Sequence, residues 1–432
     1  MKIAIIGTGI TGNAAAWLLH KDHDITVYEQ DSRIGGHSNT VSAKDSKSEH
    51  PDVDTGFIVY NEWTYPNLIA LFDHLGVETE KTDMSFGVSL EGGKVEYSGD
   101  KLFGQFSNFF RPRFYRMLAD IVRFYKTAPN YLNEQSKDMS LAEYLEWQNY
   151  SQAFIDHHIL PMAAAIWSTG SKEVGNFPAA SFIRFFVNHG LLLLKDRPQW
   201  WTVTGGSKNY VEKLTAGFKD KIKIDTPVTE ITRSDDGVLV NGEQYDHVII
   251  AAHADQALDM LGDASDEEKL VLGAFPYAPN TAYLHTDERL MPQRKSIWSS
   301  WNYLTDTVDG NVCVSYWMNK LQGFIGDEKD LFVTLNPPFE PAEDKILKVI
   351  NYAHPQYTMS ALKGWEKIKT IQGKNRTWFC GAWCGYGFHE DGITAGLAVA
   401  EELGGVKRPW DAKDKSPAGE NCRPENTKTP AL

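Results

Sequence analysis

The chain has 432 residues, 42% of them hydrophobic, and a formal net charge of −14. This length predicts two domains, and the acidic balance argues against a nucleic-acid partner. Four cysteines are too few for a disulfide framework. Cys380 and Cys384 are close in the sequence, but no second pair of possible metal ligands is nearby, so no metal is expected. We find no secretory signal and no apolar run of membrane-spanning length, which favours a cytoplasmic protein.

The first element is predicted to be a buried parallel strand over residues 2–6, KIAII. The glycine-rich turn GTGITG follows at 7–12 and leads into a helix whose free N–H groups suit a pyrophosphate. A second strand begins at Asp24 and ends at an acidic residue, which would accept hydrogen bonds from ribose hydroxyls. The pattern predicts a dinucleotide site made by Gly7, Gly9, Thr11, Gly12, Glu29 and Gln30.

The next stretch, EQDSRIGGHSNT over residues 29–40, places Arg33 and a Gly-Gly pair just after the ribose-binding acid. This run resembles the extended FAD fingerprint of the flavin-containing amine oxidase and phytoene desaturase superfamily. In that family the arginine lies by the phosphates and the glycines let the chain pass the flavin; the usual second arginine is His37 here. The resemblance implies non-covalent FAD and cofactor contacts from Arg33, Gly35, Gly36, His37 and Ser38.

Further stretches are similar to the same superfamily, namely residues 53–61, 205–214, 222–231, 245–258 and 377–403. In the last of them, the resemblance implies a helix that begins near Gly392 and points its N-terminus at the flavin, where the helix dipole favours the reduced anion. The implied cofactor contacts in these stretches are Thr55, Gly56, Val228, Gly381, Glu390, Gly392 and Ile393.

The expected fold class is α/β, a Rossmann-type FAD-binding domain with an inserted mixed α+β substrate domain, as in amine oxidases. Both domains are discontinuous in this prediction. The FAD-binding domain takes 1–60, 201–260 and 370–405, the substrate domain 61–200 and 261–369, and a poorly ordered tail 406–432. Residues 61–200 are expected to be mainly helical, and 311–318 and 330–336 to form strands.

Aromatic side chains are the candidates for the substrate pocket. Amine oxidases frame the flavin with aromatic residues, one of them two positions before the C-terminal acid, and this position is Phe388. A phenylalanine gives an apolar wall that fits a hydrocarbon better than a polar amine. Trp167 and Trp201, with its neighbour Trp200, are further candidates, with a place in the core as the alternative. The catalytic residue is left open, with His389 and Tyr386 as candidates.

Two stretches narrow the resemblance. Residues 177–214 and the run GYGFHEDG at 385–392 are similar to a bacterial group of NAD/FAD-binding oxidoreductases that includes the desaturase of methylated furan fatty acid synthesis. The resemblance implies hydride transfer to flavin N5 from a methyl-branched fatty acyl chain of membrane phospholipid. A soluble amine oxidase and a non-enzymatic flavoprotein scaffold are the alternatives.

Residues 101–126 concentrate arginines among aromatic side chains in an otherwise acidic chain. A basic, aromatic, helix-prone segment is typical of contact with a membrane surface, here its inner face, through Arg111, Arg113 and Arg116. An acyl carrier protein as partner and an ordinary helix with a solvated basic face are the alternatives. The oligomeric state is left open, with a homodimer among the options.

Overall fold

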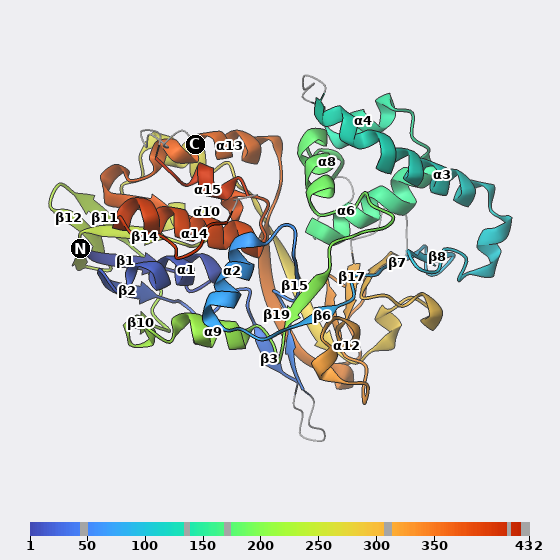
Figure 1. Cartoon of the computed structure of the whole chain (residues 1–432), viewed down its shortest axis with the longest axis horizontal. Helices are drawn as coiled ribbons and strands as arrows, with labels where there is room; N and C mark the ends of the chain where they lie inside the picture. The colour runs from blue at the N-terminus through green and yellow to red at the C-terminus, as the bar shows by residue number, and fades with distance from the viewer. Residues whose placement is uncertain (44–50, 134–138, 168–173, 306–312, 413–415, 425–432) are drawn as a thin grey trace.

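The structure is a computed structural model, and it describes residues 1–43, 51–133, 139–167, 174–305, 313–412 and 416–424. It has two parts (Figure 1), with a parallel sheet on the left and a second sheet with a group of helices on the right. Strands β15 (Tyr277–His285) and β19 (Ile346–Pro355) lie between the two parts. The predicted α/β architecture is therefore confirmed.

The five-stranded sheet has the order β10-β2-β1-β14-β20, and every neighbouring pair in it is parallel. The strands of this sheet are β1 (Lys2–Ile6), β2 (Asp24–Tyr28), β10 (Ile222–Lys223), β14 (His247–Ile250) and β20 (Thr377–Phe379). The central strands are almost entirely apolar and buried, as expected for a parallel sheet with both faces covered. Helices α1 (Ile10–Leu19) and α14 (His389–Gly404) pack against each other on this sheet, and the antiparallel strands β11 (Ile231–Ser234), β12 (Gly237–Val240) and β13 (Glu243–Tyr245) also pack on it.

Close packing of α1 requires glycine at two positions. A Cβ on Gly12 would lie 2.0 Å from the carbonyl oxygen of Gly7, and a Cβ on Gly396 would lie 2.2 Å from the carbonyl oxygen of Thr11. Because both distances are far below van der Waals contact, any side chain there would push α1 away from the glycine turn or from α14. These glycines fix where the N-terminus of α1 points.

The second sheet has seven strands in the order β19-β15-β18-β17-β16-β7-β8. Neighbours are antiparallel except β16 and β7, which are parallel. The remaining strands of this sheet are β7 (Phe86–Leu90), β8 (Val95–Ser98), β16 (Trp301–Leu304), β17 (Cys313–Trp317) and β18 (Phe332–Leu335). Strands β17 and β18 fall within the two stretches predicted to be strands.

Helices and short strands complete the two parts. Beyond the second sheet lie α3 (Pro112–Thr127), α4 (Leu141–Trp147), α5 (Gln152–Phe154), α6 (Leu160–Trp167) and α8 (Ala179–Asn188). A small sheet of β5 (Tyr60–Asn61), β9 (Trp200–Val203) and β6 (Thr79–Thr82) is formed by chain segments that run between the parts. The other elements are β3 (Thr40–Ser42), β4 (Asp52–Asp54), α2 (Pro66–Leu75), α9 (Lys208–Thr215), α10 (Ala254–Met260), α11 (Asp266–Leu272), α12 (Met318–Leu321), α13 (Met359–Ile371) and α15 (Ala418–Asn421).

The structure corrects three details of the predicted organisation. The boundary placed between 369 and 370 falls inside α13, which packs against β20 and α15. The strand expected over 222–231 is only two residues long, because the chain leaves the sheet edge after Lys223. The helix expected near Gly392 begins at His389, where Asp391 caps it by accepting a hydrogen bond from the Phe388 N–H.

The described part of the C-terminal tail is ordered, which corrects the expectation of poor order. Arg408 pairs with Glu401 of α14 at 2.7 Å, and the Asn421 amide donates to the carbonyl oxygen of Cys384 at 2.8 Å. Ala418 and Cys422 are fully buried, so a few small apolar residues anchor a segment whose composition is otherwise polar. Within the described residues, no helix has both the length and the apolar character needed to cross a membrane.

Candidate flavin and substrate site

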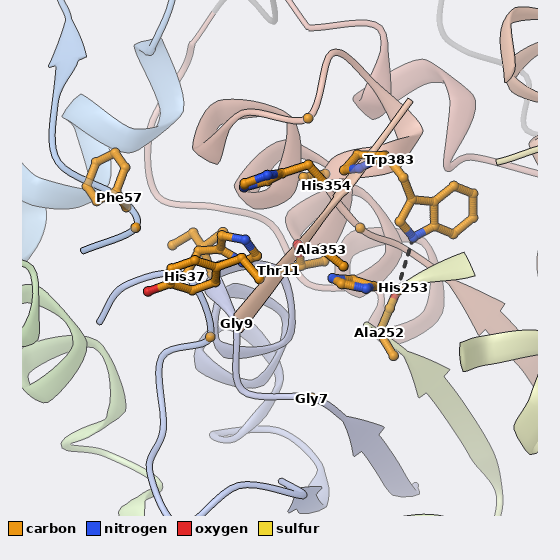
Figure 2. A pocket seen from close by; sticks show the side chains of 18 of the residues that line it. Gly7, Gly9, Thr11, His37, Phe57, Ala252, His253, Ala353, His354 and Trp383 are labelled. Carbon is orange, nitrogen blue, oxygen red and sulfur yellow. Dashed lines mark hydrogen bonds between the residues drawn. The ribbon is translucent and has the colours of Figure 1, made fainter. Parts of the chain in front are cut away.

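A cavity of about 940 Å³ lies where the carboxyl ends of β1, β2, β14 and β20 face β19 and β15 of the second sheet. Figure 2 shows the glycine turn after β1 on one side of this cavity, with the side chains of His37, His253 and His354 around it. The carboxyl edge of a parallel sheet is the usual place for a nucleotide in such folds.

The glycine turn presents bare backbone to the cavity. Gly7 has φ +100°, and a Cβ there would lie 2.8 Å from the carbonyl oxygen of Ala251. Gly9 precedes α1 as its N-cap, and no atom lies within 4 Å of the place where its Cβ would be. The first N–H groups of α1 are therefore open to an anion at close range.

Glu29 is held in place at the end of β2. One carboxylate oxygen accepts hydrogen bonds from the Thr8 N–H at 3.0 Å and from the Thr8 hydroxyl, and the other accepts from the Asp31 N–H at 3.0 Å. The residue is only 7% exposed, yet it lines the cavity. A carboxylate has about four acceptor sites, so this one can still accept ribose hydroxyls.

Among the described residues of the cavity wall, a buried nitrogen atom of an arginine and one of a histidine have no hydrogen-bond partner in the protein. They are Nη1 of Arg33 and Nε2 of His37. A buried donor without an acceptor is costly, and a diphosphate beside the open end of α1 would supply acceptors and compensate the arginine charge. Together with the bare turn and Glu29, these atoms fit FAD. Burial and the nearby His354, His253 and His389 hold the pKa of His37 well below its usual range.

His253 and His354 line the cavity but were missed in the sequence. His354 stands at the end of a chain of hydrogen bonds. The Thr281 N–H donates to Oδ1 of Asn336, and Nδ2 of Asn336 donates to Oδ1 of Asn280 at 2.6 Å. Asn280 therefore donates to Nδ1 of His354, at 2.9 Å, and the neutral ring carries its proton on Nε2. No local motif marks His354, which the pairing of β19 with β15 brings to the site, whereas His253 lies in the 245–258 stretch, three residues after the end of β14.

Most of the predicted site residues come together on the cavity wall. Those expected to touch FAD and found there are Gly7, Gly9, Thr11, Glu29, Gln30, Arg33, Gly36, His37, Thr55, Gly56, Val228 and Gly381. The substrate or catalytic candidates found there are Trp167, Tyr386, Phe388 and His389.

Six predicted cofactor contacts lie behind the wall, namely Gly12, Gly35, Ser38, Glu390, Gly392 and Ile393. Gly12 and Gly392 face the packing around α1, and Ile393 is fully buried in the core. The Gly35 N–H donates to the carbonyl oxygen of Thr8. These residues pack behind the residues that line the cavity and hold them in place.

Ser38 supports the wall through His389. The Ser38 hydroxyl lies 2.9 Å and the Tyr210 hydroxyl 3.0 Å from Nε2 of His389, and the two hydroxyls also hydrogen-bond each other. The His389 ring stacks on Phe57 with centroids 3.7 Å apart. Burial lowers the pKa of His389 to about 3, so the ring is neutral at physiological pH.

Glu390 points away from the cavity and caps α2. Its carboxylate accepts hydrogen bonds from the N–H groups of Asn67 and Leu68, at 2.9 and 3.0 Å, and from the Asn67 side chain. Its first contacts are therefore with the N-terminus of another helix rather than with a cofactor.

The tryptophan pair on β9 corrects one pocket assignment. Trp200 lines the cavity, and Trp201 does not. Successive side chains of a strand point to opposite faces, and the Trp201 ring meets the Lys81 ammonium at 5.8 Å instead. Trp301 and Tyr316, on β16 and β17, complete the aromatic wall of the second part.

Comparison with known proteins identifies the family. A family model described as flavin containing amine oxidoreductase matches residues 10–350, most of the chain. The chain belongs to this family. The family is one of FAD-dependent oxidoreductases, and FAD is the cofactor of this chain.

The sequence similarity to individual relatives is low. Flavin-containing amine oxidase A of Canis lupus familiaris is 26% identical over 265 residues, covering 56% of this chain and 47% of that protein. The match thus spans about half the length of this curated relative.

Two solved structures share the fold. Cyclohexylamine oxidase from Brevibacterium oxydans aligns with a TM-score of 0.66 at 17% identity, covering 93% of this chain and 99% of its own. A fatty acid isomerase from P. acnes that produces CLA aligns with a TM-score of 0.63 at 18% identity, covering 91% and 96%.

We expect the FAD of this protein to be non-covalent. None of the described residues that line the cavity is a cysteine, although the wall includes four histidines, whose ring nitrogens could bond the flavin. Acid precipitation should release the yellow cofactor into the supernatant. Colour retained in the pellet, and in a peptide containing His37 or another wall histidine, would contradict this expectation.

Proposed function

We propose that the protein is an FAD-dependent oxidoreductase that desaturates a fatty acyl chain of a membrane lipid, with a methyl-branched chain as the favoured substrate. Bound FAD supplies the hydride acceptor. The protein's own task is to hold an apolar chain in the cavity, exclude water and accept the proton that leaves with the hydride.

The apolar cavity wall opposite the nucleotide-binding part supports this proposal. The cavity wall contributed by the second sheet, its helices and the segment after β19 is formed largely by aromatic and aliphatic side chains, including Ile166, Trp167, Trp301, Tyr316, Leu335 and Tyr357. Among the described lining residues, every carboxylate belongs to the nucleotide-binding part: Glu29, Asp31, Asp255 and Asp259. A wall of this kind favours a hydrocarbon, since an ammonium group would have no counter-charge there.

His389 is the stronger of the two candidate proton acceptors. It lines the cavity at the start of α14 and is neutral; burial lowers its pKa to about 3 and makes it a weak base, so its position rather than its basicity favours it. The Ser38 and Tyr210 hydroxyls hold its Nε2. Burial raises the pKa of Tyr386 to about 12, so this side chain keeps its proton and acts as part of the wall, packed against Trp365.

A soluble amine oxidase is the second candidate. It is favoured by the likeness to the canine amine oxidase and by the cyclohexylamine oxidase fold. An uncharged amine with a large apolar group would also fit an aromatic wall. Family membership argues against the third alternative, a flavoprotein scaffold without enzymatic activity.

Anaerobic mixing tests the proposal. The FAD-loaded protein is mixed with bacterial lipid extract, with saturated and methyl-branched phospholipids, and with a panel of monoamines. We expect the flavin absorbance to bleach with a lipid, and mass spectrometry to find acyl chains that have lost two hydrogens. Bleaching by amines alone would establish the second candidate, and a flavin that no lipid bleaches would overturn the proposal.

A further inference from the structure

A cluster of exposed aromatic side chains lies at the edge of the second part, far from the cavity wall. It comprises Phe106, Phe109, Phe110 and Tyr115, which we call the aromatic edge. It is formed by the 3₁₀ turn η1 (Phe106–Phe110) and the start of α3, at the right-hand side of Figure 1. Phe106 is 72% and Phe110 is 74% exposed, and their rings lie 5.5 Å apart. Contiguous exposed rings of this size mark a binding surface.

The turn that carries these rings is firmly held. The buried amide of Asn108 donates to the carbonyl oxygen of Glu96 at 2.9 Å, and the Gln105 amide oxygen accepts the Glu96 N–H at 2.8 Å. Phe109 stacks on Phe103 with centroids 4.3 Å apart. The outer rings are therefore presented to solvent by a fixed platform.

The surroundings of the aromatic edge are basic. Between Lys101 and Lys126 the chain has six basic residues and one acidic residue, whereas the whole protein has a net charge of −14. The acidic residue, Asp120, is buried and already paired with Arg116 and Arg123, at 3.4 and 3.0 Å. The arginines at 111 and 113 flank the first turn of α3, beside the exposed rings.

We propose that the aromatic edge inserts into the interfacial layer of an anionic phospholipid bilayer, with Arg111 and Arg113 at the level of the headgroups. Phenylalanine rings beside arginines match the apolar and anionic layers of such a surface. A symmetric contact with a second copy would bring the same arginines together, which like-charge repulsion opposes. This docking surface does not depend on the substrate proposed above.

Vesicle binding tests the docking surface directly. The FAD-loaded protein is floated with vesicles of phosphatidylcholine and phosphatidylglycerol, and with vesicles of phosphatidylcholine alone, at about 0.05 M and about 0.5 M salt. We expect binding to the anionic vesicles that weakens at high salt. Protein that stays unbound with anionic vesicles at low salt would overturn the proposal, whatever its activity toward lipids or amines.

Paired variants separate the two contributions. Arg111→Glu with Arg113→Glu should weaken binding at least about 25-fold, since each basic residue contributes a factor of about five. Phe106→Ser with Phe110→Ser should weaken it at least about tenfold, and the tryptophan versions of the same pair should bind like the native protein. Phe106, Phe110 and Arg113 are exposed, and Arg111 is half-buried and donates a hydrogen bond to Oδ1 of Asn108 at 3.1 Å; none of the four lines the cavity, so the FAD content should not change.

Matched controls lie on the other part of the molecule. Lys219→Glu with Lys221→Glu makes the same charge change at exposed positions, and Leu270→Ser removes a 60% exposed apolar side chain. We expect these controls to bind vesicles like the native protein. Equal loss in the controls, or native-like binding by the edge variants, would overturn the proposal. So would a native dimer that dissociates on Phe106→Ser, since it would make the edge a subunit contact.

Discussion

Glu29→Arg is expected to leave the purified protein largely without FAD. The change removes an acceptor for two ribose hydroxyls and places a cation where no 2′-phosphate is present to receive it. Two hydrogen bonds to a charged acceptor contribute about 3–6 kcal/mol, so the dissociation constant should rise by more than about a hundredfold. The ratio of flavin to protein after gel filtration, and fluorescence titration of the stripped protein with FAD, measure the effect.

Two controls separate cofactor binding from folding. Glu29 also accepts hydrogen bonds from Thr8 and Asp31, so Glu29→Arg can lower the thermal stability of the apoprotein as well. Glu29→Gln keeps the size and one acceptor oxygen, and it should lose less affinity. Asp22→Arg makes the same charge change at an exposed position after α1 and should keep its FAD. Full FAD occupancy in Glu29→Arg would show that Glu29 does not bind the ribose.

Glu390→Leu is expected to destabilise the protein by about 2–6 kcal/mol. The buried carboxyl group accepts hydrogen bonds from the Asn67 and Leu68 N–H groups of α2, and a leucine would remove these two hydrogen bonds. The free energy of unfolding from denaturant titration measures this loss. A stability within about 0.5 kcal/mol of the native protein would show that the cap contributes little.

The same residue predicts a pH dependence. Burial raises the pKa of Glu390 to about 8, and that of its neighbour Asp391 to about 6. Between the unfolded pKa and these values the folded protein holds protons that the unfolded chain has lost. The contribution of each of these two groups to the free energy of unfolding should therefore fall as pH rises through its window, by about 1.4 kcal/mol per pH unit, whereas buried histidines with lowered pKa values, such as His389, contribute the opposite slope below their ordinary pKa.

Glu390→Gln tests the origin of this slope, because an amide does not titrate. The difference in the free energy of unfolding between the native protein and this variant should change between about pH 6 and 8, where Glu390 titrates and Asp391 has already lost its proton. Asp266→Asn, at a fully exposed position in the first turn of α11, should leave the slope unchanged. An identical slope in native protein and Glu390→Gln would mean that another group is responsible.

The nucleotide half of the site could be predicted from the sequence because its signals are local. The turn at 7–12, the acid at 29 and the run at 33–37 lie within one strand–helix–strand unit, where spacing alone dictates which backbone atoms meet. The similarity to a known superfamily then supplied the order of the remaining segments.

The substrate half could not be predicted residue by residue. His354 and Trp301 reach the cavity through strand registers that depend on distant partners. On β9, the sequence shows two adjacent tryptophans and does not tell which one faces inward. Glu390 was predicted to contact the cofactor because it occupies the acidic position of the C-terminal FAD motif. In the structure its side chain instead accepts hydrogen bonds from the N-terminus of α2, which packs beside it.

The order of strands in the parallel sheet has a consequence for how the protein is made. Strand β1 starts at residue 2, and its neighbour β14 pairs on the other side with β20, which ends at residue 379. The sheet therefore cannot close until most of the chain has left the ribosome. Contacts between residues so far apart in the sequence form slowly. Until β20 arrives, the apolar edge of β14 is unpaired and can associate with other protein chains. Newly made protein should consequently depend on chaperones more than its final stability would suggest.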